Sequence, residues 1–200
     1  IRQNAIKLGE QRDKQRKESA KKAEKYIEST LQLADEGNFQ VARESLQRLN
    51  PGDLSPDLKA KWFTTMTRIF QMEADIYKDN RQFLIMQALT YAQRGILAGA
   101  KQSVKDNLSQ MKAQLYMMNE QWEPTIKILS ELQSRTKSPR DRWNYRMIIA
   151  QCYDNLKEYD RSILLLDSII DETDEEAIWA NALRKKADIL YKKSHIKKLE

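Results

Sequence analysis

The chain has 200 residues, 40% of them apolar, which can bury a substantial core if the apolar residues are correctly spaced. Only five Gly and four Pro occur, which argues against the many tight turns of a β-sandwich or barrel and favours long helices. The net charge of +6 is concentrated at one end, because residues 1–25 hold nine Lys or Arg and four acidic residues. The remaining chain is nearly neutral, so nucleic-acid binding is not expected.

The first predicted helix covers residues 3–36. Its first part, residues 1–22, is predicted to be a basic, solvent-exposed helical extension, because it carries many charges and few large apolar side chains. Two alternatives to the exposed extension remain open. One is that the segment is the end of a coiled coil or linker from an upstream region; the other is that it contacts anionic lipid or nucleic acid.

Boundary residues separate the helices that follow. Gly37 is predicted to take the left-handed conformation that closes a helix, and Asn38 to cap the next one. Ser55-Pro56 and Ser138-Pro139 each place a capping hydroxyl before a proline in the first turn. Gly95 and Gly99 form a ridge of small residues for close helix packing. The later helices are predicted at 39–49, 56–79, 82–98, 101–119, 122–134, 139–156, 159–170 and 175–194.

An internal repeat of 37 residues runs through the second half of the chain. Small, aromatic and apolar residues recur at this interval: Ala113, Tyr116, Trp122, Thr125 and Leu129 return as Ala150, Tyr153, Tyr159, Ser162 and Leu166. Ala187 and Leu190 begin a further copy, Ala74, Tyr77 and Phe83 repeat the opening upstream, and the unit around Phe39 is looser. The interval predicts stacked helix pairs.

This order of small residue, aromatic, short turn, aromatic and small residue resembles the tetratricopeptide repeat (TPR). The family's usual period is about 34 residues, and here Arg81, Glu120 and Lys157 stand where the turn glycine is expected, so the chain resembles a divergent member. The resemblance implies an all-α solenoid of antiparallel helix pairs over residues 23–200. Its units would lie near 23–55, 67–105, 106–142, 143–179 and, in part, 180–200, with Phe39, Phe83, Trp122 and Tyr159 filling the angle of each pair.

Polar residues follow the same interval. Asn107, Asn144 and Asn181 recur every 37 residues, as do Gln114, Gln151 and Asp188 seven residues further along each helix. In the TPR family the corresponding face lines the concave groove, so the resemblance implies a polar ladder that binds an extended peptide; exposed positions or contacts between stacked helices are the alternative. The groove candidates are Asn107, Gln110, Gln114, Met117, Asn144, Met147, Gln151, Asp154, Asn181, Arg184 and Asp188.

Catalysis finds little support in the residue inventory. His195 is the only histidine and lies beside the C-terminus, and Cys152 is the only cysteine and falls on an apolar stripe, where a packed core residue is expected. No phosphate-binding loop or metal-loop spacing occurs, so neither a cofactor nor a metal is expected. The sequence has no stretch of 18 apolar residues, so no membrane-spanning helix is expected.

The sequence therefore predicts a non-catalytic scaffold that binds a protein or peptide. The alternative is a sensor or regulatory arm of a larger multidomain signalling protein whose catalytic or membrane part lies upstream. A cytoplasmic location is expected, with a removed targeting or anchoring segment as the alternative; the partner and the oligomeric state are left open.

Overall fold

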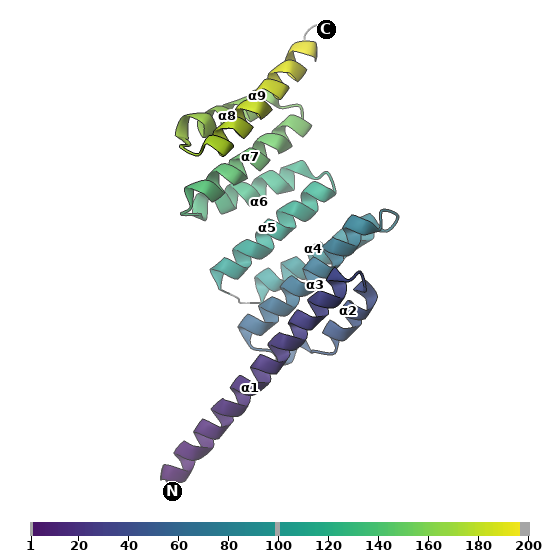
Figure 1. The fold of residues 1–200 in the computed structure, drawn as a ribbon, viewed down its shortest axis with the longest axis vertical. Coiled ribbons are helices and arrows are strands. Elements are labelled where there is room, and N and C mark those ends of the chain that lie inside the picture. The colour runs from purple at the N-terminus through teal and green to yellow at the C-terminus, as the bar shows by residue number, and fades with distance from the viewer. Residues whose placement is uncertain (1, 99–100, 197–200) are drawn as a thin grey trace. The chain divides into compact units, whose positions relative to one another are not determined.

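The computed structural model describes residues 2–98 and 101–196, and this part of the chain forms helices joined by short connections, without strands (Figure 1). The helices are α1 (Arg2–Asp35), α2 (Phe39–Gln47), the short 3-10 helix η1 (Pro51–Asp53), α3 (Pro56–Ile76), α4 (Arg81–Leu97), α5 (Gln102–Met118), α6 (Trp122–Arg135), α7 (Pro139–Asn155), α8 (Tyr159–Glu172) and α9 (Glu176–Ile196). The predicted all-α fold class is confirmed, and each predicted helix boundary lies within a few residues of the observed one.

The chain divides into two compact units, residues 1–111 and residues 112–200. The first contains α1 to α4 and the first part of α5; the second contains the end of α5 and α6 to α9. The predicted boundary at residue 22 falls inside α1, which runs without a break from Arg2 to Asp35. The division into an extension and a repeat domain at that residue stays a prediction.

In the first unit, α1 packs against α2 and α3, and α3 packs against α4. Large side chains from all four helices are fully buried, among them Ile27, Leu46, Met66 and Ile85. Gly95 of α4 packs closely against Leu108 of α5 and Phe63 of α3, which agrees with its predicted role in close packing. Gly99 lies outside the described residues.

In the second unit, α6, α7, α8 and α9 pack in sequence, and α7 also contacts α9. Two clusters form its core: Ala113, Leu129, Leu132, Tyr145 and Ile149 make one, and Ala150, Leu166, Ile169, Ala182 and Ile189 make the other. The repeat extends to its buried hydrogen bonds. Thr125 donates its hydroxyl to the backbone O of Ala113 at 3.4 Å, and Ser162 donates to that of Ala150 at 2.6 Å. The same small-residue contact therefore joins both helix pairs.

Three of the four helix pairs share one turn. Gly37, Glu120 and Lys157 all have positive φ, at 84°, 56° and 62°. In each turn the next backbone N–H bonds to a carbonyl of the last helical turn, as Gln121 N does to Tyr116 O at 2.9 Å and Glu158 N to Tyr153 O at 2.8 Å. This pattern closes a helix on a left-handed residue, so Glu120 and Lys157 do occupy the position of the turn glycine.

Because a left-handed conformation costs an L-residue with a side chain about 1–2 kcal/mol, we expect Glu120→Gly and Lys157→Gly each to raise the free energy of unfolding. The gain is expected to be about 1 kcal/mol, reduced by the greater freedom of glycine in the unfolded chain. Urea unfolding measures it. Lys127→Gly, inside α6, is the matched control and should destabilise by about 1 kcal/mol. A loss of stability in both turn variants would contradict this account.

The α3–α4 pair departs from the prediction. Its turn, residues 77–80, has four residues, whereas the other three turns, 36–38, 119–121 and 156–158, have three. Because α3 ends at Ile76 and α4 begins at Arg81, Tyr77 falls just past the end of α3 and Phe83 is the third residue of α4; the two residues are 51% and 59% exposed. The prediction that Phe83 fills the angle of this pair is wrong, and Arg81 does not take a left-handed conformation, whereas Phe39 is buried as predicted.

The predicted serine caps are confirmed. Ser55 Oγ accepts a hydrogen bond from Leu58 N at 3.4 Å, and Ser138 Oγ accepts one from Asp141 N at 3.2 Å, each with proline in the first turn. Asn38 precedes α2 as predicted, but its side chain makes no capping hydrogen bond. The closed turn at Gly37 already sets the direction in which α2 begins.

Candidate functional site

A groove of about 420 Å³ lies between α7 and α9 in the second unit. Its volume falls within the range of about 300–1,000 Å³ that is typical of ligand sites. Apolar residues of α7, α8 and α9 lie at its base and charged or polar residues of α7 and α9 along its sides. The lining consists of Ala150, Gln151, Asp154, Leu166, Arg184, Lys185, Asp188, Ile189, Tyr191 and Lys192.

Four lysines of α9 hold the helix against the preceding pair. Lys185 and Lys192, seven residues apart, reach α7: Lys185 Nζ donates to Gln151 Oε1 at 2.8 Å and Lys192 Nζ to Asp154 Oδ2 at 2.6 Å. Lys186 and Lys193, one residue further on, pair with Asp167 and Asp160 of α8. The seven-residue spacing places each pair of lysines on one stripe of the helix, so α9 is attached to α7 on one side and to α8 on the other.

Asp154 is the most buried charged residue of the groove, with 8% of its surface exposed. Its Oδ2 accepts from Lys192 and, at 3.4 Å, from Gln151 Nε2, whereas Oδ1 has no hydrogen-bond partner among the described residues. A buried carboxylate is costly unless donors surround it, and a buried ion pair is weak evidence for stability. The groove therefore contains a negative charge whose acceptor capacity is only partly used.

The structure brings four of the predicted groove residues together: Gln151, Asp154, Arg184 and Asp188. Gln151 is also a contact between stacked helices, as the alternative interpretation required, because it bonds to Lys185. Arg184 and Asp188 are exposed. The structure therefore places candidate residues of α7 and α9 close together in one groove. That they form a continuous ladder that binds a partner stays a prediction.

The other candidates lie outside this groove lining. Asn181 accepts a hydrogen bond from Arg184 at 3.3 Å, Asn144 is exposed on α7, and Met147 packs against the core cluster around Leu166. The α5 candidates fall in different units: Asn107 and Gln110 belong to the first, Gln114 and Met117 to the second. Met147 is therefore better explained as part of the core than as an anchor for a ligand.

Lys185 and Lys192 were missed by the sequence reasoning. Neither continues the 37-residue series of polar residues, and their partners lie 34 and 38 residues earlier in the chain. The only available signal was charge complementarity with Asp154, which the sequence places on the same predicted stripe as Gln151. A flexible lysine side chain gives no periodic pattern from which its partner could be identified.

The residues considered for catalysis lie in structural environments. Cys152 is fully buried, as predicted, and burial raises the pKa of its thiol to about 11, so the nucleophilic thiolate is disfavoured near neutral pH. His195 packs its ring against that of Tyr191, with centroids 4.3 Å apart. No group of three or more His, Cys, Asp or Glu suited to a metal ion occurs among the residues placed by the structure.

Among the helices that the structure describes, none combines the length and the apolar character needed to cross a bilayer.

The nine α-helices within residues 2–98 and 101–196, their antiparallel pairing and the repeated turn define a helical-repeat domain of the tetratricopeptide class. A family model described as the SusR N-terminal TPR domain matches residues 5–199, and the chain belongs to this family. The resemblance to TPR proteins is thereby confirmed. No curated protein matches the chain. Domains of this class are in general non-catalytic modules for protein interaction.

Proposed function

We propose that the chain binds an extended segment of a partner protein in the α7–α9 groove, as a non-catalytic scaffold. The observation that carries the proposal is the lining itself: an apolar base with polar side chains of α7 and α9, among them a buried carboxylate, Asp154, one of whose oxygens has no hydrogen-bond partner in the part of the chain that the structure describes. Ligand sites typically combine such an apolar base with a few polar groups that fix orientation.

Each part of the lining has a counterpart in a peptide. Ala150, Leu166 and Ile189 are buried beneath the groove, and Tyr191, 65% exposed, offers the ring surface on which an apolar side chain is placed. Asp188 can accept from a backbone N–H, and Arg184 can donate to a backbone C=O, in the manner by which an extended segment is held through its main chain. The lining carries both signs of charge, so main-chain contacts and the apolar side chain are expected to provide most of the affinity.

A charge exchange tests this proposal. Arg184→Asp combined with Asp188→Arg reverses the two exposed rim charges and conserves the net charge, while the Gln151 and Lys192 contacts remain. Peptides selected from a displayed random library on the unmodified chain are expected to bind the exchanged variant at least about tenfold more weakly, a loss of about 1.4 kcal/mol. Fluorescence anisotropy measures the affinities.

The matched control exchanges two exposed charges away from the groove, Lys137→Glu with Asp171→Lys. It should leave the affinities within about twofold, since exposed single charges contribute little. Equal affinities of all three proteins for every selected peptide would exclude this groove as the binding surface. Helical circular dichroism spectra that coincide are required for each variant before the affinities are compared.

The second hypothesis, a regulatory arm of a larger protein, is favoured by one observation. The matching family is described as an N-terminal domain, so in its namesake further sequence accompanies the repeats. For this chain we propose the same arrangement, with the additional part on the C-terminal side in place of the upstream position first expected. The coding sequence before and after the codons for residues 1–200 tests this arrangement, since it shows on which side a further domain lies. A cytoplasmic location stays a prediction.

A further inference from the structure

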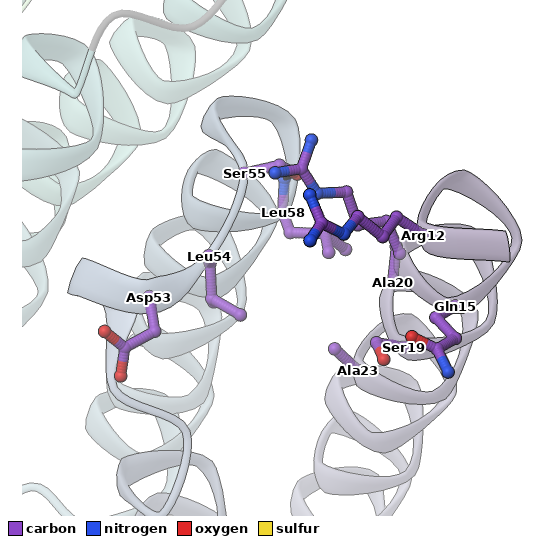
Figure 2. Close-up of a pocket in the computed structure, with 10 residues that line it drawn as sticks. Arg12, Gln15, Ser19, Ala20, Ala23, Asp53, Leu54, Ser55 and Leu58 are labelled. Carbon is purple, nitrogen blue, oxygen red and sulfur yellow. Dashed lines mark hydrogen bonds between the residues drawn. The ribbon is translucent and has the colours of Figure 1, made fainter. Parts of the chain in front are cut away.

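A second cleft lies in the first unit, between α1 and the segment that runs from η1 into α3. Its volume is about 640 Å³. Figure 2 shows the labelled side chains of α1 on one side and those of Asp53, Leu54, Ser55 and Leu58 on the other. The lining residues are Arg12, Gln15, Arg16, Ser19, Ala20 and Ala23 of α1, with Asp53, Leu54, Ser55 and Leu58 opposite.

The cleft has an apolar part and a basic part. Ala20 and Ala23 face Leu54 and Leu58, all of them only partly buried, so apolar surface remains available to a ligand. Toward the N-terminus of α1 the lining changes to arginine. Positions 12, 16, 20 and 23 follow helical spacing and lie on one face, which places both guanidinium groups beyond one end of the apolar surface.

The positive charge of the two arginines is not neutralised locally. Within the described residues neither Arg12 nor Arg16 has a carboxylate at ion-pair distance, and Asp53, the acidic residue of the lining, bonds to Asn50 at 3.0 Å. Nearby Lys61 differs, because it pairs with Glu24 at 2.8 Å and Glu28 at 2.7 Å. Desolvation lowers the pKa of Lys61, but the hydrogen bonds to these two glutamates raise it overall.

We infer that this cleft docks an acidic segment of a partner protein, with one large apolar side chain on the surface formed by Ala20, Ala23, Leu54 and Leu58, and two carboxylates at Arg12 and Arg16. Guanidinium groups bind carboxylates through paired, charge-assisted hydrogen bonds. Charge complementarity therefore favours an acidic segment as the ligand of this cleft. This site lies in a different unit from the α7–α9 groove and does not depend on it.

The spacing of the arginines specifies the segment further. Residues four apart on a helix are separated by about 6 Å along its axis. Two acidic residues four apart on a helix match this distance, as do residues two apart in an extended strand, at about 6.6 Å. The docked segment is thus an acidic helix or an acidic strand with an apolar residue next to its carboxylates. Nucleic acid fits less well, because the lining has no aromatic side chain on which bases stack.

The probe for this inference is a short fluorescein-labelled peptide with two Glu residues four apart and one Trp a turn beyond them. We expect the unmodified chain to bind it and Arg12→Glu with Arg16→Glu to weaken binding at least about tenfold, the loss that follows from removing two charge-assisted contacts. The matched control is Lys14→Glu with Lys22→Glu, which makes the same change in net charge on α1 outside the cleft lining. It should change the affinity less than about threefold.

A second pair of reagents keeps the charges and removes the apolar contact. Ala20→Phe fills the apolar surface, and a probe with Ser in place of Trp lacks the anchor; each is expected to weaken binding about tenfold. Equal losses in the two charge variants would overturn the inference in favour of general attraction to α1. Absence of probe binding to the unmodified chain would also overturn it, as would stronger binding of single-stranded RNA or phosphatidylglycerol vesicles that the Arg12 and Arg16 changes abolish.

Discussion

Replacing Gly95 with valine is expected to lower the free energy of unfolding by about 3 kcal/mol, because the added side chain enters a contact that is already closed. A Cβ at this position would lie 2.7 Å from Leu108 Cδ1 and 2.9 Å from Phe63 Cβ. Leu108 can move the end of its side chain, but the Cβ of Phe63 moves only with α3. The helices themselves must therefore separate, and urea unfolding followed by circular dichroism will measure the cost.

The smaller substitution Gly95→Ala gives a sharper test, because the sign of its effect on the free energy of unfolding is decisive. Gly→Ala inside a helix ordinarily stabilises by about 0.5–1 kcal/mol, yet Gly95→Ala should destabilise. Gly52→Ala is the control, since a Cβ there meets only the side chain of Asn50, at 3.2 Å. Leu108→Ala should make the Gly95 substitution less costly, so the two changes together should cost less than their sum. A stabilising Gly95→Ala would contradict the close packing of α4 against α3 and α5.

Trp62→Ala is expected to cost about 3–5 kcal/mol, the range for removing a large aromatic side chain from a core. Trp62 is 4% exposed, packs its ring edge-on against Phe63, and lies 5.9 Å from the ring of Tyr91, centroid to centroid. Its Nε1 donates to Leu46 O at 2.9 Å, which ties the end of α2 to α3. Loss of this side chain therefore removes packing within the second helix pair and a hydrogen bond to the first.

Two comparisons separate these contributions. Trp62→Phe keeps most of the packing and removes the donor, and because Leu46 O also accepts from Leu49 N at 3.1 Å, the cost should be only about 1 kcal/mol. Trp179→Ala, at a site 42% exposed, should cost less than about 1 kcal/mol. Similar losses for Trp62→Ala and Trp179→Ala would show that burial does not decide the outcome.

Most of the fold could be predicted because the signals are local and repeated. The 37-residue interval identified the pairs built from α5 to α8, and a serine before a proline gave the starts of α3 and α7 to the residue. The α3–α4 pair was described incorrectly because Ala74, Tyr77 and Phe83 match the spacing of the other pairs in sequence. α3 ends before Tyr77 and α4 begins two residues before Phe83, whereas Tyr116 lies inside α5 and Trp122 is the first residue of α6, and no local signal reports this difference.

The sites were less predictable, because each depends on which helices become neighbours. Periodicity found Gln151, Asp154 and Asp188, but the lysines that reach α7 become relevant only once α9 is in place. The α1–α3 cleft was missed for a related reason. Residues 1–22 were interpreted as an exposed extension, which describes Arg12 and Arg16 alone, whereas the cleft also needs Leu54 and Leu58 from the segment around η1.

The length of α1 has an energetic consequence for the first unit. Residues 10–19 are all exposed, although the helix continues through them. A helical stretch without tertiary packing is held mainly by its own propensity and by the turns that follow it, so its amide protons should exchange far sooner than those around Ile27. The free energy of binding a ligand at Arg12 therefore includes the entropic cost of ordering this stretch. Such binding would slow the hydrogen exchange of its amide protons.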